Sequence, residues 1–237
     1  MFVSSPVDLE SLRAKVEKNF PSASTRRTTH CIPIGIDDLD EMLGGGIALA
    51  GVSAWVGRPG SGVLSIVRTL VRRALMDQRR VAVVDGTARF MASDWLVDGN
   101  ESNLWMMRLR EVQHAFSAAE TLARCGVFEL VAVDVGTLRT SNEAYRAYLR
   151  RASKEGTSAL LLIGEHVGSF GAKVVQIESS EFDLASLERT IKLSLVRGGS
   201  PHTLELLLDV AGQFIPCRMP SHSALPDRRP RAKRSST

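Results

Sequence analysis

The feature that most constrains the fold is a series of short apolar runs, separated by stretches with helical periodicity. The runs are VSAWV (52–56), VAVVD (81–85), NLWMMRL (103–109), ELVAVD (129–134) and SALLLIG (158–164). Continuous apolar strands of this length are typical of a parallel sheet that helices cover on both faces. The sequence therefore predicts an α/β fold with a mainly parallel central sheet.

The stretches between and after these runs complete the expected architecture. Apolar residues at helical spacing predict helices over 36–43, 63–75, 112–125 and 142–154. After Gly171 the pattern changes to strands only, with KVVQIE, ERTIKLSLVR and HTLELLLDV broken by the turn signal RGGSP. We expect these last strands to be antiparallel and to extend the sheet.

The loop that follows the first apolar run, GRPGSGVLS (57–65), carries the glycines of a phosphate-binding loop. Gly57 and Gly62 have the spacing of the pattern G-x-x-x-x-G-K-[ST], and Gly60 lies between them. The lysine and the Ser/Thr of that pattern are replaced by Val63 and Leu64. The loop therefore lacks a cation for phosphate and a hydroxyl for Mg²⁺, and we expect its glycines to serve a tight strand-to-helix turn.

The segments that flank the core predict a division into residues 1–30, 31–215 and 216–237. Residues 7–19 read as an amphipathic helix, followed by a polar linker. Its apolar stripe must pack on the protein's own core or on a neighbour, and it consists of Leu9, Leu12, Val16 and Phe20. The helix is expected to lie outside the core as a docking or oligomerisation arm.

The charge of the chain is concentrated in its tail. The whole chain carries +4, but residues 216–237 hold six basic residues against the single acid Asp227, so the remainder carries −1. The candidate binding residues of the tail are Arg228, Arg229, Arg231, Lys233 and Arg234. Two interpretations stay open: weak, sequence-independent contact with DNA phosphates, or a solvated tail that aids solubility or the docking of a partner. The core shows no cationic surplus that would favour nucleic acid.

Other classes of protein are disfavoured by composition. No apolar run reaches the ~18 residues of a membrane helix, and the first residues lack the pattern of a signal peptide. The three cysteines are scattered, which argues against a disulfide framework and for a reducing cytoplasm. The five histidines show no metal-ligand spacing, so we expect no metal site.

Several segments, in their order and spacing, resemble the RecA recombinase core. IPIGIDDLDEMLGGGI is similar to the segment before the RecA phosphate loop, and ELVAVD to the Walker B strand, which ends here in Asp134. VAVVDGTARF and LLLIGEHV resemble the strands that carry the catalytic glutamate and the phosphate-sensing glutamine. The resemblance implies a RecA-like three-layer core, and for the helix at 7–19 it implies docking on an adjacent subunit.

The departures from this pattern fall on its chemistry. Thr87 stands in place of the catalytic glutamate, and Glu165 in place of the sensor glutamine. With Val63 and Leu64 in the loop, only Asp134 of the expected ATPase residues is retained. The chain is therefore expected to have lost ATPase activity and to use no cofactor.

Among RecA-like proteins with degenerate nucleotide sites, the chain resembles the ImuA family. That resemblance implies a bacterial, cytoplasmic and nucleoid-associated accessory protein of SOS-induced translesion synthesis. The implied partners are RecA and an ImuB-like protein of an error-prone polymerase complex, with weak DNA contact and homo-oligomerisation as further expectations. Two alternatives remain: a SulA-like inhibitor of cell division, and a RecA-, RadA- or KaiC-type ATPase with an atypical phosphate loop.

Overall fold

A computed structural model describes residues 31–95, 101–139, 143–179, 189–208 and 214–216 of the 237-residue chain. The predicted N-terminal helix with Leu9, Leu12, Val16 and Phe20 lies outside the described residues. The same holds for the basic residues of the tail. Within the described ranges, every helix is too short or too polar to cross a bilayer.

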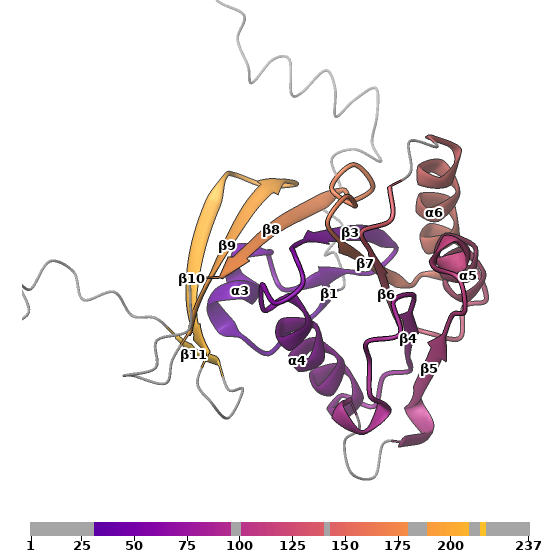
Figure 1. Cartoon of the computed structure of the whole chain (residues 1–237), viewed down its shortest axis with the longest axis horizontal. Helices are drawn as coiled ribbons and strands as arrows, with labels where there is room; N and C mark the ends of the chain where they lie inside the picture. Colours follow the sequence, from indigo (N-terminus) through magenta and orange to yellow (C-terminus); the bar gives the residue numbers. More distant parts are fainter. Residues whose placement is uncertain (1–30, 96–100, 140–142, 180–188, 209–213, 217–237) are drawn as a thin grey trace, which may run out of the picture.

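The described residues form a nine-stranded sheet in the order β11-β10-β9-β8-β3-β7-β6-β4-β5, together with a small sheet of β1 and β2 (Figure 1). The strands of the large sheet are β3 Gly51–Val56, β4 Val81–Asp85, β5 Leu104–Arg108, β6 Leu130–Gly136, β7 Ala159–Gly164, β8 Lys173–Ser179, β9 Arg189–Arg197, β10 His202–Leu208 and β11 Phe214–Pro216. The small sheet pairs β1 Cys31–Ile32 with β2 Ile47–Ala48.

The apolar runs are the central parallel strands, as predicted. β3, β7, β6, β4 and β5 are parallel neighbours, and every residue of β4, β6 and β7 is buried. The C-terminal extension is also present, because β10 pairs antiparallel with both β9 and β11, and β9 pairs antiparallel with β8. The predicted α/β fold with a mainly parallel sheet is confirmed.

β8 joins the parallel part of the sheet to its antiparallel extension. It pairs parallel with β3, with Ser53 opposite Lys173, and antiparallel with β9, in keeping with the expected antiparallel arrangement of the last strands. The short loop 165–172 leaves the end of β7 and returns beside β3, where the Ala172 N–H donates to the Val52 carbonyl at 2.8 Å. An apolar β pattern reveals a strand but not its direction, which here is set by this crossing.

Helices cover both faces of the sheet and give the expected three layers (Figure 1). On one face, α3 (Asp37–Met42) and α4 (Val63–Met76) pack into one buried apolar cluster. On the other, α5 (Ala115–Arg124) and α6 (Glu143–Gly156) contribute to a second cluster. The helix predicted over 112–125 begins with a 3-10 turn, η3 (Val112–His114); two further 3-10 turns are η1 (Ala92–Asp94) and η2 (Glu101–Asn103).

Candidate functional site

The candidate site lies where the parallel strands β3, β6 and β7 end and the loop 57–62 leads into α4. In open α/β sheets, ligands bind in the crevice outside the carboxyl ends of the parallel strands. The preferred place is the point at which the strand order reverses. A cavity of about 200 Å³ opens here. Its lining consists of Gly57, Arg58, Pro59, Gly60, Gly62, Val63, Leu64, Ser65, Arg89, Asp134, Gly136, Ile163, Gly164, Glu165 and Arg189.

The two positions that should contact phosphate and metal contribute apolar side chains to the core. Val63 is only 5% exposed and belongs to the buried cluster that also contains Ile191 of β9. Leu64 is half-buried and packs against the same cluster. Both side chains line the cavity, so its wall at the start of α4 is apolar at these positions.

The glycines of the loop meet steric demands of the turn. Gly62 has φ +88°, and a Cβ placed there would overlap the Cδ1 atom of Ile191. Gly57 is also restricted, because an added Cβ would lie 2.5 Å from the Ser61 hydroxyl oxygen. Gly60 has φ +83°, but an added Cβ would meet open space. The left-handed backbone therefore favours glycine at Gly60 and Gly62, and close packing restricts Gly62 further; neither reason involves a phosphate.

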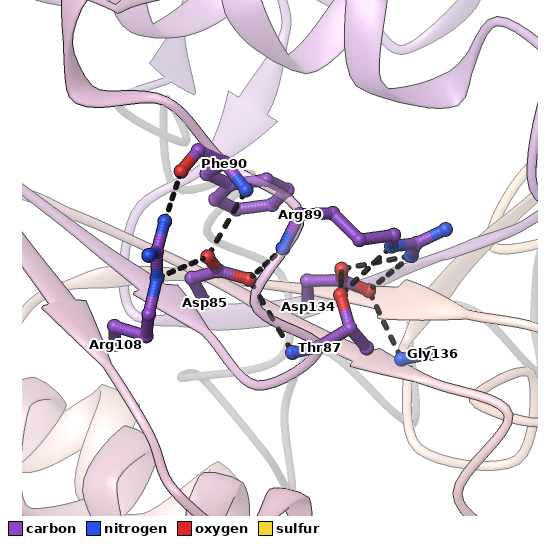
Figure 2. A network of polar contacts seen from close by, with 7 residues as sticks. All are labelled: Asp85, Thr87, Arg89, Phe90, Arg108, Asp134 and Gly136. Atoms are coloured by element: carbon purple, nitrogen blue, oxygen red, sulfur yellow. Dashed lines mark hydrogen bonds and ion pairs between the residues drawn. The ribbon is translucent and has the colours of Figure 1, made fainter.

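The carboxylate of Asp134 at the end of β6 is the centre of a polar network (Figure 2). Its Oδ2 accepts a hydrogen bond from the Thr87 hydroxyl at 2.5 Å and lies 2.8 Å from Nη2 of Arg89. Its Oδ1 accepts from the same Nη2 at 3.1 Å and from the Gly136 N–H at 2.9 Å. Arg89 also donates from Nε to the Thr87 hydroxyl oxygen at 2.8 Å. Asp134 is fully buried, whereas the Arg89 side chain is 34% exposed.

A second buried carboxylate, Asp85 at the end of β4, shapes the loop that presents Arg89 (Figure 2). Its Oδ1 accepts from the N–H groups of Thr87 and Arg89 at 3.3 and 3.1 Å. Its Oδ2 accepts from the Phe90 N–H at 3.0 Å and from Nε of Arg108 at 3.3 Å. Asp85 thus folds residues 86–90 into a turn over the strand ends, and this turn places Thr87 and Arg89 above Asp134.

The network occupies the acceptor capacity of Asp134. An ionised carboxylate offers about four lone-pair sites, and the four contacts of Asp134 use them all. A divalent cation would compete with a guanidinium that is already held at 2.8 Å and carries the compensating charge. In this arrangement, Asp134 is part of an internal ion pair.

The structure brings together the eight residues that were predicted for the degenerate nucleotide loop and its surroundings. Glu165 lines the same cavity as the glycine loop and Asp134, and its N–H donates to the Gly136 carbonyl at 2.9 Å. Thr87 contacts Asp134 directly through its hydroxyl. The described residues include no group of three or more His, Cys, Asp or Glu side chains placed to hold a metal ion.

Sequence reasoning missed Asp85, Arg89 and Arg108. Arg89 lies within VAVVDGTARF, a segment that was noted only because it resembles the RecA strand with the catalytic glutamate. Its partner Asp134 is 45 residues away in the sequence. The contact depends on the pairing of β4 with β6, which sets Asp85 opposite Asp134. A signal was present in the sequence: two acids that each close a buried strand need compensating cations.

Comparison with curated proteins finds a distant similarity to the DNA repair protein RadA of Mycobacterium tuberculosis, in strains CDC 1551 and H37Rv. Identity to each is 30% over 168 residues, which covers 64% of this chain and 34% of the relative. The chain thus matches about a third of the length of these curated relatives. No protein-family model matches the chain. RadA is a RecA-family protein, so this similarity and the sheet topology support a place in the RecA-like superfamily.

The glycines of the loop give a first prediction. Gly62→Ala should lower the free energy of unfolding by about 2–4 kcal/mol, because a left-handed backbone and an overlap with Ile191 add to each other. Gly60→Ala is the matched control and should cost only about 1–2 kcal/mol, since its Cβ would meet open space. Denaturant unfolding of both variants measures the difference; equal losses would contradict the packing role of Gly62.

The ion pair gives a second prediction. Arg89→Met should lower the free energy of unfolding by about 1.5–3 kcal/mol, because the buried Asp134 carboxylate loses its cation. Adding Asp134→Asn to this variant should recover part of the loss. The control is Arg68→Met, whose ion pair with Asp94 is about 40% exposed on both sides and should be worth at most about 1 kcal/mol. If the double-mutant cycle shows no coupling free energy between Arg89 and Asp134, the stabilising ion pair between them is refuted.

Proposed function

We propose that this protein is a non-catalytic, RecA-like accessory protein of SOS-induced DNA damage tolerance, which acts in translesion synthesis and mutagenesis through protein contacts. The observation that carries the proposal is the ion pair of Arg89 with Asp134, at 2.8 Å, in a cavity whose helix begins with Val63. The one expected ATPase residue that the sequence retains is thereby engaged inside the protein.

The energetics of nucleotide binding support this proposal. A charge-assisted hydrogen bond contributes about 1.5–3 kcal/mol, and the loop lacks both the lysine and the hydroxyl that would make such contacts. Two missing contacts amount to about 3–6 kcal/mol, or roughly 10²- to 10⁴-fold in affinity. Glu165 adds a negative charge to the cavity lining and would repel a phosphate at close range.

The assignment to DNA repair is supported by the distant similarity to proteins named DNA repair protein RadA. The choice of translesion synthesis rests on the resemblance to the ImuA family, which combines a RecA-like core with an eroded nucleotide loop. On this proposal, the partners are RecA, an ImuB-like protein of the polymerase complex, or both.

A mechanism follows from the loss of ATP-coupled switching. The apolar stripe of residues 7–20 would dock on a RecA subunit, as the corresponding helix of RecA does. A subunit that joins or caps a RecA filament without hydrolysing ATP would restrain the filament and leave lesions to the bypass polymerase. The basic tail would then be available to DNA phosphates or to a partner of the polymerase complex.

A second candidate is a RadA-type ATPase with an atypical phosphate loop, and the 30% identity to RadA is the observation that favours it. The two candidates differ in one measurable property, the binding of ATP with Mg²⁺.

The third prediction concerns this property. Titration of the full chain with labelled ATP and Mg²⁺ should show no binding in the micromolar range and no hydrolysis above background. Asp134→Asn serves as the control: under our proposal it leaves this baseline unchanged, whereas in a working ATPase it removes a Mg²⁺-dependent signal. Micromolar binding that Asp134→Asn abolishes would establish the ATPase candidate instead.

The fourth prediction concerns the N-terminal stripe. Wild-type protein should slow RecA-dependent strand exchange when the two are mixed, and Leu12→Asp should abolish this effect because it places a charge in the apolar stripe. Lys15→Asp is the matched control, since it introduces the same residue on the polar side of the stripe and should retain inhibition. Inhibition that survives Leu12→Asp would exclude this stripe as the contact.

A further inference from the structure

A groove separate from the glycine loop lies between α3 and the hairpin of β9 and β10. Its volume is about 460 Å³, and its lining consists of Asp38, Glu41, Met42, Leu195, Gly199, Ser200, His202 and Leu204. Apolar side chains come from both sides, with Met42 on α3 and Leu195 and Leu204 on the hairpin. The two acids come from α3, and no lysine or arginine lines the groove.

The acids of the groove are not used by the fold. Asp38 and Glu41 are exposed, and among the described residues neither forms an ion pair or a hydrogen bond through its side chain. Their neighbour Asp40 contrasts with them, because it accepts hydrogen bonds from the N–H groups of Ile34 and Gly35 at 2.7 and 3.0 Å. Asp40 therefore fixes the start of α3, while Asp38 and Glu41 leave two uncompensated negative charges beside an apolar surface.

The course of the last described strand leads toward this groove. β11 is antiparallel to β10, with Phe214 opposite Leu208 and Pro216 opposite Leu206. From Phe214 to Pro216, β11 therefore points along β10 toward Leu204 and His202, which line the groove. Among the described residues, β11 covers this edge of β10 only from Leu206 to Leu208, so the edge from His202 to Glu205 is open to further pairing.

We propose that the basic C-terminal segment of the same chain, residues 217–237, docks in this groove. The first residues after Pro216 would continue β11 along the open edge of β10, and the cationic part would then meet the acids of α3. That part is RRPRAKR (228–234), which carries five positive charges. Charge, strand direction and the open edge each point to the same occupant.

The length of the segment is sufficient for this contact. Arg228 lies 12 residues after Pro216, so an extended chain can bring it up to about 40 Å away. The path along β10 from Leu206 to His202 covers four residues, or about 13 Å. The remainder allows the chain to turn from the sheet edge toward α3.

Docking would limit the fraction of molecules in which the tail is free to bind a partner. The acids of α3 would compete with any anionic partner, nucleic acid or protein, for the same arginines and for Lys233. Exposed ion pairs of this kind weaken with salt, because the Debye length falls to about 3 Å at 1 M. The contact is therefore a reversible mask on the tail. It does not depend on the proposed role in damage tolerance.

The test is carbodiimide cross-linking of the full-length protein, read out by mass spectrometry. Lys233 is the single lysine of the tail, so a zero-length cross-link from Lys233 to Asp38 or Glu41 reports the docked state. We expect this cross-link in the monomer band at low salt. It should disappear in the double variant Asp38→Asn/Glu41→Gln. Asp37→Asn is the matched control: Asp37 is exposed on the same helix but does not line the groove, and its substitution should leave the cross-link intact.

A second measurement uses the rate of tryptic cleavage within residues 228–234. Loss of two exposed ion pairs in Asp38→Asn/Glu41→Gln should speed this cleavage about 3- to 10-fold at low salt, and the difference from wild type should vanish at high salt. Charge reversal on both sides is compared within one tail variant, Arg229→Glu/Arg231→Glu, so that the cleavage sites stay the same: adding Asp38→Lys/Glu41→Lys to it should slow cleavage at Arg228, Lys233 and Arg234. The proposal is overturned if cleavage rates are equal in all variants, or if the cross-link appears only between two chains.

Discussion

Two buried carboxylates at the ends of neighbouring parallel strands are the constraint around which the site is organised. Asp85 and Asp134 lie opposite each other in the register of β4 and β6, and both are fully buried. Buried like charges are costly unless each is paired and hydrogen-bonded. The turn after β4 meets this requirement, because backbone N–H groups and Arg108 satisfy Asp85, while Thr87 and Arg89 satisfy Asp134. The shape of this turn and the chemistry of the site thus have one physical origin.

The glycines of the loop have structural reasons that do not depend on any reaction. Gly62 is required by its left-handed conformation and by the close approach of Ile191, neither of which involves a phosphate. Val63, at the position of the lysine in the phosphate-loop pattern, belongs to the apolar cluster that also contains Ile191. Backbone conformation and packing therefore constrain the loop whether or not a phosphate binds to it.

The central strands and the helices between them could be predicted from sequence, because continuous apolar runs and helical periodicity are local patterns. The parallel direction of β8 could not, since it depends on how the loop 165–172 crosses beside β3. The site was predicted in part. Sequence motifs identified the loop glycines, Asp134 and Glu165. They did not identify Arg89, because its role depends on a contact with Asp134, which lies 45 residues further along the chain.

The placement of Arg89 also determines what a metal ion would have to displace in order to reach Asp134. The guanidinium is attached to the chain and lies 2.8 Å from the Asp134 carboxylate, so a divalent cation would have to compete with a tethered charge. An arrangement with a lysine in the loop and a metal ion on Asp134 would need Arg89 to leave Asp134 and a lysine to replace Val63 in the apolar cluster. The first change alone leaves a buried carboxylate without its cation, and the second alone places a charge in the core. The ion pair and the apolar cluster therefore act as linked restraints, because neither side of the cavity can change alone without a cost to the fold.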